Sequence, residues 1–199
     1  MTASLELPLF PLHTVLFPGG LLPLRIFEPR YLEMVSDCLR EDRLFGIVLI
    51  SEGEETGRAA AFHNLGTLAR ITDWQQEDDG LLGITCTGER RFRILSSVVG
   101  DNQLVTARVE LLSDHPSMPV PEAFGYLKAL LEQMLSLTGR SGLEMRDDAA
   151  WVAGRMAEIL PIEMQRKQQL LEMDEPLEQL AEVAAEAAEL ARRPESSAH

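Results

Sequence analysis

The fold of this chain is decided by residues 5–50, which read LELPLFPLHTVLFPGGLLPLRIFEPRYLEMVSDCLREDRLFGIVLI. Four prolines, Pro8, Pro11, Pro18 and Pro23, divide its first half into short apolar runs. Proline cannot donate a hydrogen bond to a sheet, so it is confined to the edges, starts and bends of strands. The stretch therefore predicts short, kinked strands of a small, closed or strongly curved sheet, followed by one helix and one buried strand.

The second half of the stretch supplies that helix and that strand. Proline is favoured at the first helical position, so a helix is predicted to begin at Glu28-Pro29. Residues 44–50 are almost wholly apolar, which predicts a central strand covered on both faces. The apolar residues that recur at helical spacing, and so predict the buried face of the helix, are Tyr31, Val35, Cys38 and Leu39.

The sequence up to residue 112 continues as strands and turns. Residues 51–63 are polar and aperiodic and predict a loop, and Gly66 to Gln75 predicts a strand. Asp78-Asp79-Gly80 predicts a hairpin turn, and alternation on both sides of Thr87-Gly88-Glu89 predicts two strands broken at that tripeptide. A turn at 100–102 and a half-buried strand at 105–111 complete a β-rich region with one inserted helix.

The pattern changes to helical after a proline-rich boundary at 113–121. We therefore predict two parts, a β-rich subdomain at 1–117 and a helical bundle at 118–199 with a frayed acidic tail. The first helix is predicted to end at Gly139, and the second to open at Asp147-Asp148. The first helix is predicted to bury the stripe Ala123, Leu127, Leu130, Met134 and Leu137.

Composition limits the classes of function. The net charge is −14, and acidic residues outnumber basic ones on both sides of residue 117, which disfavours binding to nucleic acid or to anionic membranes. No apolar run is long enough to span a bilayer, and the N-terminus lacks the basic residue that opens a signal peptide. We therefore expect a cytoplasmic protein with no membrane partner. The sequence does not indicate an oligomeric state.

The residues show no pattern that is typical of a catalytic or metal site. Lys128 and Lys167, the two lysines, are predicted on the polar faces of helices, and neither lies in a phosphate-binding loop. The histidines have no zinc-ligand spacing. Cys38 and Cys86 lie within apolar patterns, so buried thiols are favoured over a disulfide. We expect no enzymatic activity, no cofactor and no metal.

Several motifs in order resemble the N-terminal substrate-binding domain of Lon ATP-dependent proteases. They are Pro8-Leu9-Phe10-Pro11-Leu12, Leu16-Phe17-Pro18-Gly19, Pro23 to Tyr31, Phe45-Gly46, Gly66 to Ile71, Gly88 to Arg93, Leu160-Pro161 and Lys167 to Glu172. The resemblance covers about residues 5–185. It implies an α+β fold, with a β pseudo-barrel similar to RNA-binding PUA domains followed by an all-α bundle. The chain departs from the family at Gln179-Leu180, where the resemblance leads us to expect Arg-Leu.

The resemblance implies a stand-alone domain that binds protein substrates or peptides, as an adaptor or regulator of proteolysis without ATPase or protease modules. Its expected partners are unfolded or extended protein segments and a protease component. Strand addition at a proline-interrupted edge is one way to hold such a segment. Arg25 and Arg30 have two interpretations, as charges that fix a corner with Glu28 or as the rim of a groove. The candidate peptide-binding residues are Phe17, Arg25, Phe27, Arg30 and Tyr31.

The alternative function is RNA binding through the PUA-like barrel. Arginines around an aromatic can hold single-stranded nucleic acid. Alternation along 91–94 instead favours a strand whose arginines face solvent. The candidate nucleic-acid-binding residues are Arg90, Arg91, Phe92 and Arg93.

Overall fold

A computed structural model describes residues 4–137 and 144–192 of the chain. It divides into two compact units, Met1–Asp114 and His115–His199. The predicted mixed α+β class is confirmed, with a six-stranded sheet and five α-helices in the described ranges. None of the described helices is both long and apolar enough to cross a bilayer.

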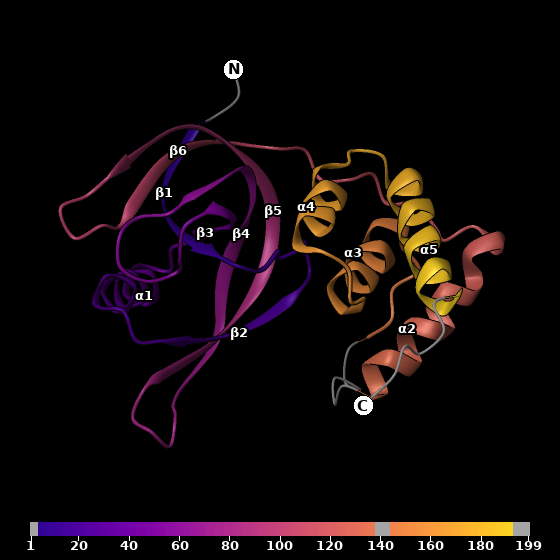
Figure 1. Ribbon diagram of the computed structural model, residues 1–199, viewed down its shortest axis with the longest axis horizontal. Coiled ribbons are helices and arrows are strands. Elements are labelled where there is room, and N and C mark those ends of the chain that lie inside the picture. Colours follow the sequence, from indigo (N-terminus) through magenta and orange to yellow (C-terminus); the bar gives the residue numbers. More distant parts are fainter. Residues whose placement is uncertain (1–3, 138–143, 193–199) are drawn as a thin grey trace. The chain divides into compact units, whose positions relative to one another are not determined.

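The first unit is a sheet rolled up on itself with one helix (Figure 1). β3 pairs with β1 in parallel and with β4 antiparallel; β4 pairs with β5, β5 with β6, and β6 with β1, so these pairings close a ring. β2 stands outside the ring and pairs only with the first part of β5. The elements are β1 (Ser4–Leu12), β2 (Leu21–Ile26), α1 (Pro29–Glu41), β3 (Phe45–Glu52), β4 (Ala61–Gln76), β5 (Leu82–Val99) and β6 (Val105–Leu111).

The interior of the ring is filled by Phe92, which is fully buried. A Cβ atom at Gly46 or Gly66 would lie 2.6 or 2.8 Å from the tip of the Phe92 ring. Those two positions therefore admit only glycine without displacement of the ring, which explains both glycines physically. The other buried residues of this cluster are Leu7, Leu9, Val48, Leu68, Val105, Ala107 and Val109.

A second apolar cluster lies between α1 and the sheet. The helix begins at Pro29, as predicted, and Asp42 ends it in the left-handed conformation. Its buried face holds Tyr31, Val35 and Cys38 as predicted, but the prediction for Leu39 is wrong: Leu39 is exposed and Met34 is buried instead. Met34 is related to Cys38 by four residues, so these two residues share one side of the helix.

The predicted break at 87–89 is only partly correct: β5 is one strand from Leu82 to Val99, but its register with β4 shifts between Gly88 and Arg91. Gly88 is also the position where the chain entering β2 meets β5. Its N–H donates to the carbonyl of Gly20 (2.8 Å), and its own carbonyl accepts from the N–H of Gly19 (2.7 Å). A Cβ at Gly88 would lie 2.3 Å from the carbonyl oxygen of Phe17, so glycine permits this close backbone approach.

The second unit contains a short 3-10 helix at Glu122–Phe124 and four α-helices, of which α3 is the most buried. Asp148 caps α3, since its side chain accepts from the N–H of Trp151 (2.9 Å) as helix-opening aspartates do. The predicted stripe of α2 is correct only at Leu127, because Leu131 and Leu135 are the other buried residues and Leu137 is exposed. The predicted stop at Gly139 lies outside the described residues. The helices are α2 (Gly125–Leu137), α3 (Ala149–Ile159), α4 (Met164–Glu172) and α5 (Pro176–Arg192).

Two buried polar side chains connect these helices. Lys167 was predicted on a polar face, but it is buried, and its Nζ donates to the carbonyl of Glu158 at the end of α3 (2.9 Å). Burial lowers the pKa of Lys167. Gln179, where the family resemblance led us to expect arginine, is buried on α5 and donates from Nε2 to the carbonyl of Leu170 on α4 (2.8 Å). Both groups bond to carbonyls in the last turn of a helix, where partners within the helix are missing or few; the Leu170 carbonyl also accepts from the N–H of Met173 (3.3 Å).

Candidate peptide-binding site

Burial divides the five predicted peptide-binding residues into two groups. Phe17 is 1% exposed, Arg30 is 4% exposed and Tyr31 is 5% exposed, so no ligand reaches them in this conformation. Arg25 and Phe27 are exposed. Proline-interrupted apolar runs predict strands, but they do not distinguish a core strand from an edge strand. Only the structure therefore shows which of these residues are buried and which are exposed.

Arg30 has a structural role at the start of α1. Its guanidinium donates to the carbonyls of Gly57 (2.7 Å), Gln103 (3.1 Å) and Glu55 (3.2 Å), and it lies 4.7 Å from the centre of the Tyr31 ring. Its Nε is 3.7 Å from Glu28, which favours the interpretation of these charges as a fixed corner. Tyr31 in turn stacks on Phe10, with ring centres 3.9 Å apart, and burial raises its pKa.

The two exposed residues lie on and beside β2. Arg25 forms an ion pair with Asp79, which lies in the turn between β4 and β5. Phe27 directly follows β2 and is 56% exposed. A large aromatic exposed to this degree next to an edge strand marks a place where a partner could bury it.

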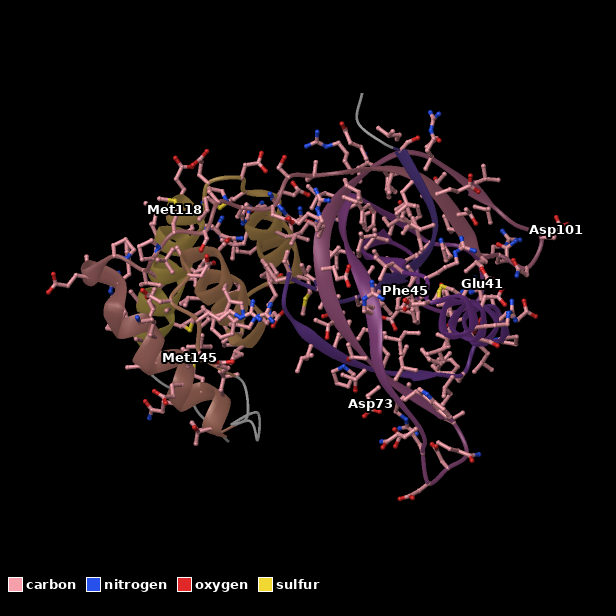
Figure 2. The ribbon with its side chains drawn as sticks, turned by 180° about the vertical axis from the view of Figure 1, so that it is seen from behind. Glu41, Phe45, Asp73, Asp101, Met118 and Met145 are labelled. Atoms are coloured by element: carbon pink, nitrogen blue, oxygen red, sulfur yellow. The ribbon has the colours of Figure 1, made fainter. Side chains whose placement is uncertain are left out.

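A groove of about 370 Å³ lies beside these residues, over the part of the sheet where β2, β5 and β4 are neighbours. Its most prominent side chain is Trp74 on β4, which is 61% exposed. Figure 2 shows Asp73, its neighbour in the chain, where this hairpin leaves the barrel. The lining residues are Pro23, Leu24, Arg25, Asp73, Trp74, Gln75, Glu77, Gly83, Ile84 and Thr85.

Sequence reasoning did not identify Trp74, although a signal was available. The residue is the only aromatic in the polar run Thr-Asp-Trp-Gln-Gln, just before the hairpin turn. A tryptophan on a strand end with polar neighbours on both sides has little apolar surface to pack against. Such an isolated aromatic is the pattern expected of an exposed binding residue.

The backbone of β2 also faces outward at alternate residues. Gly20 faces β5, since it accepts from Gly88, and the register continues regularly from Leu21 opposite Thr87 to Ile26 opposite Leu82. Hydrogen-bonded and non-hydrogen-bonded pairs alternate in an antiparallel ladder. The backbone groups of Leu21, Pro23 and Arg25 therefore point away from β5. This outer edge offers three carbonyls and two N–H groups, because Pro23 has none.

The Arg90–Arg93 segment does not form a basic surface. Arg91 and Phe92 are buried, so the prediction that Arg91 faces solvent is wrong. Arg90 pairs with Asp114 (3.3 Å) and donates to the carbonyl of Leu112 (2.8 Å), and Arg93 is exposed. Because Arg90 is already paired with an acid, Arg93 alone does not form the positively charged groove that binds a phosphate backbone. The RNA-binding alternative therefore finds no support here.

The two thiols lie in the core and are both free. Burial raises the pKa of Cys38 to about 11 and that of Cys86 to about 12. A nucleophilic cysteine needs a lowered pKa and some exposure. Neither residue has these properties, so both act as small apolar residues of the cluster beneath α1.

Comparison with known proteins identifies the family. Residues 6–186 match the family described as the ATP-dependent protease La (LON) substrate-binding domain. The chain belongs to this family. Lon protease 2 of Myxococcus xanthus is 32% identical over 136 residues, which are 66% of this chain and 16% of that protein. Lon protease of Anaeromyxobacter dehalogenans is 26% identical over 177 residues, covering 83% and 21%. The chain thus spans about a fifth of these curated LON relatives.

Solved structures agree with this assignment. A Lon N-terminal domain protein from Xanthomonas campestris is 39% identical with a TM-score of 0.76, over 91% of this chain and 98% of that one. The N-terminal domain of a Mycobacterium avium complex Lon protease shares the fold, with a TM-score of 0.66, 16% identity and coverage of 92% and 98%. The likeness therefore extends over both units of the LON domain.

Proposed function

We propose that this LON domain binds unfolded or extended protein segments at the groove beside β2, without catalysing a reaction itself. The observation that carries the proposal is the combination of a free strand edge with an exposed tryptophan, in a chain of the LON substrate-binding family. The exposed residues Arg25 and Phe27 belong to this site. Phe17, Arg30 and Tyr31 support it from the core.

The segment would bind by strand addition. The outward carbonyls of Leu21, Pro23 and Arg25 would accept hydrogen bonds, and the N–H groups of Leu21 and Arg25 would donate them. Main-chain pairing of this kind gives affinity, and alternate side chains give specificity. The side chains of the segment on the groove side of the sheet would contact Leu24, and the longest of them would reach over β2 toward Trp74, which lies two strands away on β4.

The charges of the groove predict which segments bind best. Asp73 and Glu77 line it, and Arg25 is already paired with Asp79, so the acidic groups are in excess. Opposite charges favour association and like charges oppose it. We therefore expect segments that alternate apolar with basic residues to bind more tightly than those that alternate apolar with acidic residues.

This binding would serve proteolysis, with the domain as an adaptor or regulator that presents clients to a protease component. The 199 residues contain no phosphate-binding loop, so we expect no ATP hydrolysis and no casein cleavage by the purified chain. We also expect RNA binding to be weak and non-specific, since the net charge is −14, Arg91 is buried and Arg90 is paired with Asp114.

The chain provides its own optical probe for the test. Trp74 is exposed and Trp151 is buried, so a Trp151→Phe background leaves Trp74 as the reporter. We would titrate this background with two synthetic peptides of about ten residues, long enough for one strand, which alternate valine with lysine or valine with glutamate. The account predicts a change in Trp74 emission with the lysine peptide and a weaker response to the glutamate peptide.

The decisive variant is Trp74→Ala, followed by peptide anisotropy. We expect affinity to fall about tenfold, as for an interface aromatic, with the melting temperature unchanged because the side chain is exposed. The matched control is Tyr126→Ala, which removes an aromatic that is 55% exposed on α2. Equal affinity in Trp74→Ala, Tyr126→Ala and the unmodified chain would show that the groove is not the binding site.

A further inference from the structure

A second free edge lies at the far end of β5. The pairing of β5 with β4 ends at Arg93 opposite Leu65, and beyond it β5 pairs only with β6 in the described part of the chain. The residues of this end are Leu95, Ser96, Ser97, Val98 and Val99, and all five are exposed. Val98 is 71% exposed, a large fraction for a branched apolar side chain in a strand.

This end lacks the features that protect sheet edges. Native proteins guard an edge with charged residues or proline. Residues 95–99 contain neither. Other strand ends that extend past a partner do contain them: Glu6 and Pro8 in β1, Glu52 in β3, and Arg70 and Asp73 in β4. An edge left without protection is a surface suited to pairing.

The backbone pattern defines what can pair there. The N–H of Gly100 donates to the carbonyl of Leu104 (2.8 Å), so Gly100 faces the β6 side. The register is regular from Val99 opposite Val105 to Ser96 opposite Arg108, so Ser96 and Val98 also face β6. The N–H and carbonyl groups of Ser97 and Val99 therefore point to the free edge. That is two donors and two acceptors in symmetrical order.

We propose that this edge pairs with the same edge of a second copy of the chain, antiparallel and about a twofold axis at Val98. In this register Ser97 of each copy lies opposite Val99 of the other, so all four outward groups of each edge form hydrogen bonds. Val98 then lies directly opposite Val98 of the second copy. This interface goes beyond the proposed function, because it involves neither β2 nor the groove.

The side chains fit the same register. Thr106, the partner of Val98, lies between buried Val105 and Ala107, so Val98 points to the outer face of the barrel and would be covered by its counterpart. The pairing also brings Asp101 of the second copy toward Arg93, with opposite charge. Figure 2 shows Asp101 at the outer end of the β5–β6 hairpin, away from the other labelled residues.

Electrostatics does not oppose the pairing locally. Although the whole chain has a net charge of −14, residues 92–111 contain two arginines, Arg93 and Arg108, and two acids, Asp101 and Glu110. Pairing of two short edges buries less surface than the roughly 1,000 Å² of a stable complex. We therefore expect a weak dimer, with a dissociation constant on the order of 10 µM to 1 mM.

Cysteine cross-linking tests the register. Residues opposite each other in a non-hydrogen-bonded pair have Cα atoms about 4.5 Å apart, which suits a disulfide. Val98→Cys should therefore form a covalent dimer under mild oxidation. The matched control is Ser96→Cys, a residue on the same face of β5 that would lie four residues from its counterpart. The native thiols are buried and should not contribute. Equal cross-linking of the two variants would overturn the proposed register.

Introducing a charge at Val98 tests the interface in solution, where sedimentation equilibrium measures self-association. Val98→Lys and Val98→Glu should each weaken self-association about tenfold, because like charges would lie opposite each other. An equal mixture of the two should restore association. Both variants should melt normally and bind peptide as the unmodified chain does, so failure of the dimer is distinguishable from failure of the β2 site. A chain that stays monomeric up to about 1 mM, or a mixture no better than its components, would overturn the proposal.

Discussion

β2 and the end of β5 are both free edges of one rolled sheet, yet they differ in every feature that controls pairing. β2 has Pro23 in the middle of its outward backbone groups and a charged Arg25 beside it. A groove with Trp74 lies next to it. The β5 end has a full set of donors and acceptors and no charge.

The difference indicates two kinds of occupant. An edge with a missing donor cannot form a regular ladder with its own copy, but with side-chain contacts in a groove it can still hold a foreign segment. An edge with two donors and two acceptors in symmetrical order is suited to its own copy. Proline and charge at an edge thus disfavour pairing with a second copy of the chain but still allow a peptide segment to bind.

The largest expected effect separates the core beneath β2 from the groove beside it. Phe17→Ala should lower the free energy of unfolding by about 3–5 kcal/mol, because the ring is buried where the chain enters β2. Phe27→Ala, which removes an exposed ring, should change it by less than about 0.5 kcal/mol. Urea denaturation measures both. Equal midpoints for the two variants would show that burial does not distinguish these phenylalanines.

The second prediction exchanges the properties of the two edges. Ser97→Pro removes an outward N–H from the β5 end without removing a hydrogen bond to β6, so self-association should fall about tenfold. Pro23→Thr restores the missing donor of β2, so it should create self-association that persists in a Val98→Lys background. Sedimentation equilibrium of Ser97→Pro, of Pro23→Thr and of Pro23→Thr combined with Val98→Lys measures these changes in self-association. If neither substitution moved the monomer–dimer balance, the backbone pattern of these edges would not control pairing.

The third prediction concerns the thiol beneath the β2–β5 ladder, where Cys86 lies opposite Leu22. Burial raises its pKa from the ordinary value of 9.0 to about 12. The unfolded chain therefore loses this proton first, so the stabilisation is complete below pH 9 and is lost as the pH rises toward 12. The slope should reach about 1 kcal/mol per pH unit.

Cys86→Ala should reduce this slope, while Cys38, whose pKa burial raises to about 11, keeps its own contribution of the same sign. Urea midpoints at pH 8 and pH 10 measure the difference. Burial lowers the pKa of Lys167, so this residue makes stability rise with pH. Its contribution is the same in Cys86→Ala and in the unmodified chain, and it therefore cancels when the two slopes are compared. An unchanged slope in Cys86→Ala would mean that the thiol is not the group responsible.

The smallest expected effect lies at the rim of the groove. Arg25 and Asp79 are both partly exposed, so Asp79→Asn should change stability by less than about 1 kcal/mol. The substitution also releases Arg25 and removes one negative charge. Binding of the lysine peptide should weaken slightly and lose part of its salt dependence, as anisotropy at two salt concentrations would show. Stronger binding of that peptide would contradict the acidic character of the groove.

Much of the fold could be predicted from sequence because the deciding signals are local. Pro29 fixed the start of α1, Asp148 the start of α3, and the apolar run at 44–50 the central strand. The site could not be predicted in the same way. Phe17 and Phe27 have similar apolar neighbours, and only the pairing of distant strands buries one and exposes the other. The break predicted at 87–89 is a register shift within one strand, and the approach of Gly88 to Phe17 likewise depends on residues distant in the sequence.

Amide hydrogen exchange followed by mass spectrometry tests most directly whether the two edges have separate occupants. The lysine peptide, added at low protein concentration, should slow exchange of the N–H groups of Leu21 and Arg25 and leave Ser97 and Val99 unchanged. Raising the protein concentration without peptide should slow Ser97 and Val99 and leave β2 unchanged. Protection of Ser97 and Val99 by the peptide, or of Leu21 and Arg25 by concentration alone, would contradict the account.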